Sequence, residues 1–209
     1  MKTNWDSYYD NPIATSGYSR RVMRRNLINL MKNYTKNRSE NFELAEFGGA
    51  NSCFFDAIYQ SIQPQIYHVV DNNKTGLDKL IARVSHLDSV KIHHCDVLAL
   101  DLNDSFDLTF SVGLIEHFNE SDTAKVVMQH FASTKAGGIV ILTFPTPTFL
   151  YRITRFFAEK LKLWIFHDER PLLPDEVIST TKTYGNILYQ KTVWSIFLTQ
   201  HIIVIQKKA

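Results

Sequence analysis

The chain has few of the residues that hold small extracellular folds together. Its 209 residues include two cysteines, Cys53 and Cys95, which are too few for a disulfide framework and are not spaced as a C-x-x-C metal site. Both thiols are expected to be free and buried, because cysteine often behaves as a small apolar residue. No apolar run reaches the ~18 residues of a membrane-spanning helix, and the start of the chain lacks the apolar region of a secretory signal. We therefore expect a soluble, cytoplasmic protein without an integral membrane segment.

Acidic residues are absent from residues 11–39, where seven basic residues lie. Residues 40–122 have the opposite balance, with fourteen acidic and four basic residues. A basic arm thus precedes an acidic central region, although the net charge is only +2. Such an arm could meet nucleic acid, lipid headgroups or a phosphorylated substrate, but a solvated helix face is the more common arrangement.

The apolar spacing predicts alternating strands and helices up to Pro145. Helices are expected over 19–34, 52–62, 76–87 and 121–135, with Ser19 and Ser121 as caps; strands are expected over 41–47, 65–73 (ending at Asp71), 90–98 (stopping near Cys95), 106–112 and 137–145. This alternation indicates βαβ units and a parallel sheet, and the apolar strands suit a sheet that is covered on both faces.

The pattern changes after Pro145. Residues 145–171 read as a helical, aromatic-rich insertion, and residues 173–185 as a short helix with Pro174 near its start. Residues 186–208 contain two β-rich runs with an expected turn near Gln190 and Lys191. Runs this close must pair antiparallel, because a parallel return needs a crossover.

Polar residues and glycines follow four successive strands. Strand by strand they are Glu46 with Gly48 and Gly49, then Asp71, then Asp96, then Ser111, Val112 and Gly113. In an open α/β sheet such strand ends meet at one crevice. An acidic crevice attracts a cationic ligand and repels a pyrophosphate. The dinucleotide pattern G-x-G-x-x-G also fails, because Ala50 and Cys53 stand at its later glycine positions. A nicotinamide dehydrogenase is therefore disfavoured.

This order of strand-end residues resembles that of the class I S-adenosylmethionine-dependent methyltransferases, from about Glu43 to Lys208. The resemblance implies an α/β, doubly wound, mostly parallel seven-stranded sheet with helices on both faces and a C-terminal antiparallel hairpin. It implies one domain, 1–209, with an arm and basic helix (1–39), a cofactor-binding core (40–145), a lid or acceptor insertion (146–185) and a β-hairpin (186–209). The segment Gly-Gly-Ala-Asn-Ser is also similar to methyltransferases of bacterial surface-polysaccharide synthesis.

The resemblance implies a site for S-adenosylmethionine and its product S-adenosylhomocysteine. The implied cofactor-binding residues are Tyr18, Glu46, Gly48, Gly49, Ala50, Asn51, Asp71, Asn72, Asp96, Val97, Ser111, Val112, Gly113 and His117. Gly48 to Ala50 would let the methionine part lie against the backbone, Asp71 would take the ribose hydroxyls, and Asp96 would contact the adenine. Ala50 and Ser52 stand where many members of the family have glycine.

Three residues are candidates for catalysis: His117 as general base, Glu116 to orient it, and His167, which with Asp168 forms a second candidate pair in the insertion. Each also has a plain structural interpretation, His117 and Glu116 as helix-start residues and His167 as part of a surface loop. No metal site is expected. The sequence lacks the Asn/Asp-Pro-Pro-Tyr segment after the fourth strand, which argues against methylation of the amino groups of bases. It also lacks a cysteine in the loop after the fourth strand, so the covalent route to C5 of pyrimidines is disfavoured.

We expect transfer to an oxygen or nitrogen of a small-molecule or glycan-type acceptor, with an anionic or lipid-linked one among the candidates. The aromatic, basic insertion is open to four interpretations. It could form a lid over the acceptor or a membrane-surface helix for a lipid-linked acceptor. It could also be a helix packed on the sheet or a dimer surface. Two alternatives remain: a catalytically inactive binding module with the same fold, and an RNA methyltransferase using the basic helix. The sequence leaves the oligomeric state open.

Overall fold

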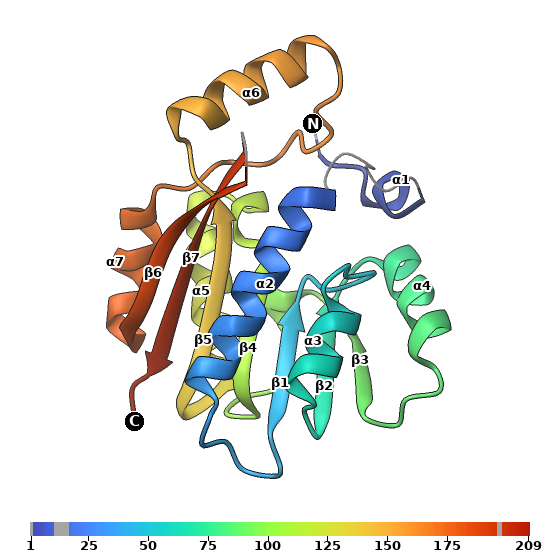
Figure 1. Cartoon of the computed structure of the whole chain (residues 1–209), viewed down its shortest axis with the longest axis vertical. Coiled ribbons are helices and arrows are strands. Elements are labelled where there is room, and N and C mark those ends of the chain that lie inside the picture. Colours follow the sequence, from blue (N-terminus) through green and yellow to red (C-terminus); the bar gives the residue numbers. More distant parts are fainter. Residues whose placement is uncertain (1, 11–16, 196–197) are drawn as a thin grey trace.

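The protein is described by a computed structural model that covers residues 2–10, 17–195 and 198–209. A seven-stranded sheet forms its centre, with strand order β3-β2-β1-β4-β5-β7-β6 (Figure 1). The strands are β1 (Glu43–Phe47), β2 (Ile66–Asp71), β3 (Val90–His94), β4 (Phe106–Val112), β5 (Thr134–Pro145), β6 (Gly185–Ser195) and β7 (Leu198–Lys207). The first five pair in parallel, and β7 is antiparallel to both β5 and β6. The predicted fold class is confirmed.

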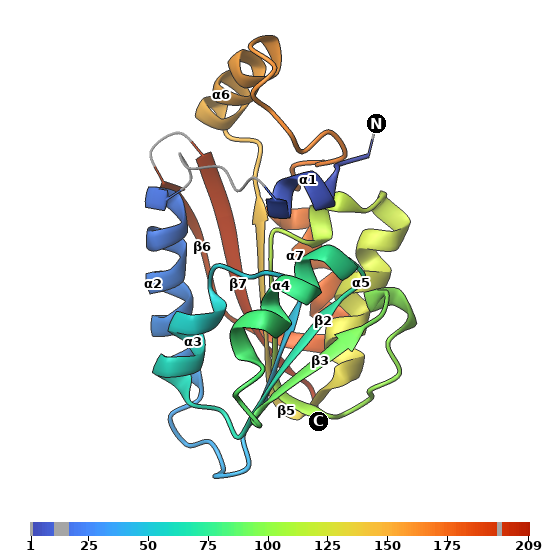
Figure 2. The same cartoon turned by 90° about the vertical axis from the view of Figure 1, so that its right-hand side faces the viewer.

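Helices cover both faces of this sheet. They are α1 (Trp5–Asp10), α2 (Gly17–Tyr34), α3 (Phe55–Ile62), α4 (Lys74–Val84), α5 (Glu120–Ser133), α6 (Phe149–Lys160) and α7 (Pro174–Tyr184), with short 3-10 turns η2 (Val97–Ala99) and η3 (Ile115–His117). One buried apolar cluster joins α2, α3 and α4 to the sheet, and a second joins α5 and α7 to the opposite face (Figure 2). Alternate side chains of each strand enter the two clusters, as the pleat requires.

Some predicted boundaries were wrong. The expected turn at Gln190 and Lys191 lies within β6, where these residues pair with β7, so the strands meet further along. The cap of α5 is Asn119 rather than Ser121, because the Asn119 side chain accepts a hydrogen bond from the backbone N–H of Asp122. The helix predicted over 52–62 begins only at Phe55, because Ser52 turns its side chain toward Glu46.

The carboxyl ends of the parallel strands are covered by two outlying helices. Figures 1 and 2 both show α1 and α6 beyond these ends, with α6 standing apart from the sheet. In the described ranges, no helix has both the length and the apolar character to cross a membrane. The ends of β1, β2 and β4 therefore face a space that α1 and α6 partly enclose.

Candidate active site

A cavity of about 1420 Å³ lies at the carboxyl ends of the strands. Most of the residues predicted for the site line it: Tyr18, Glu46, Gly48, Asn51, Asp71, Asn72, Asp96, Val97, Val112, Gly113, Glu116 and His117. Gly49, Ala50 and Ser111 are not part of the lining, and the latter two are fully buried. His167 is exposed and also lies outside the lining.

The two adjacent glycines after β1 are required for different reasons. Gly48 has φ +72°, a left-handed conformation that favours glycine. A Cβ on Gly49 would lie 2.7 Å from Cγ of Glu46 and 3.1 Å from Cγ1 of Val69. Gly49 therefore makes room for the side chain of Glu46, whereas Gly48 is the glycine that faces the cavity.

Asp71 is held rigidly at the end of β2. Its Oδ2 accepts the backbone N–H of Ala50 at 3.0 Å, and its Oδ1 accepts that of Asn73 at 2.8 Å. Burial raises the pKa of Asp71, although these N–H groups partly offset the effect. A carboxylate offers about four lone-pair positions, so the oxygens can still accept hydrogen bonds from a ligand.

Glu46 is a buried carboxyl at the end of β1. Its oxygens accept hydrogen bonds from the hydroxyls of Ser52 and Tyr67, each at 2.6 Å. Burial raises the pKa of Glu46 to about 7, with the nearby Asp71 adding to the shift and the two hydroxyls opposing it. The charge of Glu46 is thus easily changed near neutral pH, and a cation in the cavity would favour its ionised form.

His117 and Asp168 form a hydrogen-bonded pair in the cavity wall. His117 Nδ1 lies 3.0 Å from Asp168 Oδ1, and Asp168 is held in turn by the backbone N–H and the hydroxyl of Thr3. Burial would raise the pKa of Asp168, but the bonds from Thr3 and His117 outweigh it and lower that pKa. Burial lowers the pKa of His117 by more than Asp168 raises it. The imidazole is therefore neutral at pH 7, and an Nδ1–H bond to Asp168 leaves Nε2 with a lone pair.

Aromatic rings surround this pair. The Trp5 ring lies 4.9 Å from the His117 ring, centroid to centroid, and Phe166 lies 5.9 Å from it. Trp5 belongs to α1, which is fixed by a hydrogen bond from Asn73 to Asp6 and by an ion pair between Lys79 and Asp10. The cavity therefore has an acidic part at β1 and β2 and an aromatic part around His117.

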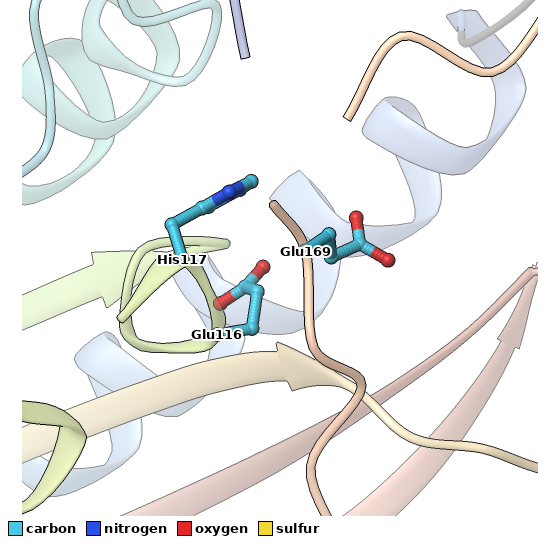
Figure 3. A group of neighbouring side chains, drawn as sticks. All are labelled: Glu116, His117 and Glu169. Atoms are coloured by element: carbon cyan, nitrogen blue, oxygen red, sulfur yellow. The ribbon is translucent and has the colours of Figure 1, made fainter. Parts of the chain in front are cut away.

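Two further carboxyl groups lie beside His117. Figure 3 shows Glu116 and His117 on the turn that follows β4, and Glu169 on the segment between α6 and α7. One ligand atom of each lies within 4.8 Å of the others, so the three could hold a metal ion. Burial, and then the charge of Glu169, raises the pKa of Glu116 well above its ordinary value. Glu116 Oε2 is buried without a hydrogen-bond partner among the described residues.

The segment that carries Asp168 and Glu169 is fixed to the turn after β4. The backbone N–H of Arg170 donates to the carbonyl of Glu116 at 2.9 Å. Its guanidinium binds both oxygens of Glu176 on α7, at 2.8 and 2.9 Å. Tyr151 of α6 donates its hydroxyl to Glu169. These hydrogen bonds and this ion pair therefore hold Asp168 and Glu169 of the insertion in place at the cavity.

Sequence reasoning missed the partners that make this site. Asp168 was paired with its neighbour His167, whereas the structure pairs it with His117, 51 residues away. Glu169 and Trp5 were not singled out at all. The only signals in the sequence are that Glu169 lies next to another acidic residue, Asp168, and that Trp5 lies close to Tyr8 and Tyr9. The expectation of two buried thiols was also wrong, because Cys53 is exposed at the cavity and Cys95 is half-buried.

Comparison with protein families gives a match over part of the chain. Residues 45–138 match the family model described as a methyltransferase domain. No curated protein matches the chain.

Several solved structures share the fold at low sequence identity. A 1,6-didemethyltoxoflavin-N1-methyltransferase from Burkholderia thailandensis, with bound 1,6-didemethyltoxoflavin and S-adenosylhomocysteine, has a TM-score of 0.74 and 12% identity, covering 98% of this chain and 85% of that one. Magnesium protoporphyrin IX methyltransferase from Synechocystis PCC 6803, with S-adenosylhomocysteine, has a TM-score of 0.74, 9% identity and coverages of 98% and 93%. The N-methyltransferase NodS from Bradyrhizobium japonicum WM9, also with S-adenosylhomocysteine, has a TM-score of 0.67, 10% identity and coverages of 88% and 87%. At these identities the likeness shows the fold alone.

Proposed function

We propose that this chain, whose residues 45–138 match a methyltransferase-domain model, is a class I S-adenosylmethionine-dependent methyltransferase that methylates an oxygen or nitrogen of a small-molecule or sugar-containing acceptor. One observation carries the proposal: the acidic strand ends and the His117–Asp168 pair line the same cavity. A cofactor site and a proton acceptor therefore lie within reach of one another.

The residues of the acidic part fit the cofactor. When bound, S-adenosylmethionine supplies an activated methyl group on a sulfonium. Its positive charges match the carboxyls of Glu46, Asp71 and Asp96, all of which line the cavity. We assign the ribose hydroxyls to Asp71, because that carboxylate is buried, fixed by two backbone N–H groups and still able to accept. Asp96 and Val97 are assigned to the adenine.

His117 is proposed as the general base. Asp168 fixes the ring and its tautomer, so that Nε2 can accept the proton which an acceptor hydroxyl or amine loses as it is methylated. The lowered pKa keeps the imidazole unprotonated at pH 7. Asp168 is thus a positioning residue, and His167 has no part in the proposal.

The size of the cavity supports an acceptor beside the cofactor. Ligand pockets commonly measure about 300–1,000 Å³, and this cavity of about 1420 Å³ exceeds that range. Trp5, Phe166 and Trp164 line the acceptor part and would contact an apolar or ring-shaped surface.

Calorimetric titration with S-adenosylhomocysteine tests the cofactor assignment. We expect micromolar binding by the wild type and at least about tenfold weaker binding by Asp71→Asn, since hydrogen bonds to a charged group contribute about 1.5–3 kcal/mol. Asp101→Asn, at an exposed aspartate outside the cavity lining, is the matched control, and NAD⁺ is the ligand control. A folded wild type that binds no S-adenosylhomocysteine would favour an inactive module with the same fold.

The alternative use of the basic helix α2 needs a separate test. Its exposed arginines include Arg21 and Arg25, while its apolar side is buried in the core. An RNA methyltransferase would bind RNA with a steep salt dependence that neutralising these arginines reduces. We expect no such binding, because the acceptor part of the cavity is aromatic and enclosed by α1 and α6.

A further inference from the structure

Helix α6 has two faces of different kinds. Tyr151, Thr154 and Ala158, spaced three and four residues apart, line the cavity. The other side carries large apolar side chains in solvent. Phe149 is 77% exposed, Phe156 55% and Phe157 57%, and Leu161 just beyond the helix is 66% exposed. This exposed set, Phe149, Phe156, Phe157 and Leu161, is called the α6 apolar face below.

Exposed apolar residues are common one at a time, but a cluster of this kind marks an interaction surface. Leu150 and Ile153 of α6 are also exposed, at 38% and 39%, and the remaining exposed large apolar residues in the described part of the chain are scattered over several elements, such as Ile81 on α4 and Met128 on α5. The α6 apolar face is instead confined to one protruding element, which Figures 1 and 2 show apart from the sheet.

The charges beside the α6 apolar face are mostly positive. Arg152, Lys160 and Lys162 are exposed there. The one acidic residue between 146 and 166, Glu159, is in an ion pair with Arg155 at 2.7 Å. Lys160 also lies over the ring of Phe156, with its Nζ 5.3 Å from the ring centroid. Aromatic and aliphatic side chains with a rim of lysine and arginine are the pattern of helices that lie in the headgroup region of a bilayer.

We propose that α6 docks the protein onto an anionic lipid bilayer, with the α6 apolar face in the headgroup region and the basic residues on lipid phosphates. A second copy of the chain fits this surface less well. In a two-fold symmetric contact the same patch meets itself, so the basic residues would face one another.

Docking by α6 would also place the cavity at the bilayer surface. The cavity-lining side of α6 lies directly behind the α6 apolar face, so an acceptor anchored in lipid could enter beside Tyr151 and Trp164. The lipid-linked nature of the acceptor rests on the proposed function, whereas the docking itself does not.

Vesicle flotation of the whole protein tests the docking. The probes are vesicles of phosphatidylcholine alone and vesicles of phosphatidylcholine with phosphatidylglycerol. We expect binding to the anionic vesicles, weakened by salt because exposed charges are screened. Phe156→Ser/Phe157→Ser and Arg152→Glu/Lys160→Glu should each weaken it at least about tenfold. Ile81→Ser/Met128→Ser is the matched control, since it removes two exposed apolar side chains elsewhere, and it should bind as the wild type does.

The outcomes separate this inference from the proposed function. S-adenosylhomocysteine binding without vesicle binding overturns the docking and leaves the methyltransferase assignment intact. Vesicle binding without S-adenosylhomocysteine binding supports the docking alone. The wild type could instead fail to float with vesicles and form a dimer by light scattering. If Phe156→Ser/Phe157→Ser dissociates that dimer, the α6 apolar face is a contact between copies and the proposal is overturned.

Discussion

Glu46→Gln should remove the part of the pH dependence of stability that comes from Glu46. The pKa of Glu46 is about 7 in the folded protein, against an ordinary value of 4.5. An acid whose pKa is raised by folding stabilises the fold fully below its unfolded pKa, and this contribution is lost as the pH rises through its folded pKa. The window therefore runs from about pH 4.5 to about pH 7.

The magnitude follows from the same two values. Each pH unit between them is worth about 1.36 kcal/mol, so ionisation of Glu46 should cost the wild type about 3 kcal/mol by pH 8. Glutamine cannot ionise and keeps an oxygen that can accept from Ser52 or Tyr67. The free energy of unfolding of the variant should therefore rise relative to that of the wild type by this amount as the pH increases through the range from about 4.5 to about 8.

Urea denaturation at pH 5, 6, 7 and 8 measures the effect. The free energy of unfolding of Glu46→Gln minus that of the wild type should rise by about 2–3 kcal/mol from pH 5 to pH 8. Titrating groups that do not interact with Glu46 cancel in this difference, whereas Asp71, whose charge helps to raise the pKa of Glu46, cancels only in part. Parallel curves for the two proteins would show that Glu46 ionises near its ordinary pKa, and the description of this carboxyl as desolvated would fail.

Three other changes test the site. Gly49→Ala should destabilise the fold by about 1–3 kcal/mol in urea denaturation, because its Cβ would lie 2.7 Å from Cγ of Glu46; an unchanged midpoint would contradict the close approach. Asp168→Asn should lower the pKa of His117 further, because the charge of Asp168 raises it; NMR titration of the His117 ring measures this, and an unchanged or higher pKa would refute the pairing. Mn²⁺ should stay free by electron paramagnetic resonance, because burial raises the pKa of Glu116 and so disfavours its ionised form, and Glu169 is bonded to Tyr151; stoichiometric binding lost in Glu169→Gln would make His117 a metal ligand.

The fold could be predicted because its signals are local. Apolar periodicity and glycines after strands mark each βαβ unit, and the observed strands follow them closely. The hairpin turn was misplaced because β6 and β7 are continuous in β-forming residues, so nothing in the sequence marks where the chain reverses. Pairing with β5 decides the register instead.

The acidic part of the cavity could be predicted for the same reason. Asp71 is the last residue of β2 and Asp96 lies two residues after β3, and the topology brings both to the cavity. His117 was also predicted to line the cavity, but its pairing with Asp168 could not be predicted, because it depends on where the insertion returns to the sheet. Arg170 fixes that return through Glu116 and Glu176. The contact between Asp168 and His117 is a consequence of this packing, so no spacing in the sequence reveals it.

The reason for a glycine at position 49 could not be predicted from the sequence either. A glycine pair after a strand suggests close approach by a ligand, but this glycine is approached by Glu46 of its own strand. Only the position of the neighbouring side chain separates these two causes.

The central claim is that one cavity holds the cofactor and the base. A crystal structure of the complex with S-adenosylhomocysteine tests it most directly. We expect ribose hydroxyls on Asp71, adenine beside Asp96 and Val97, and the sulfur on the side of the cavity that His117 lines. A ligand bound elsewhere, or in this cavity with the sulfur directed away from His117, would contradict it.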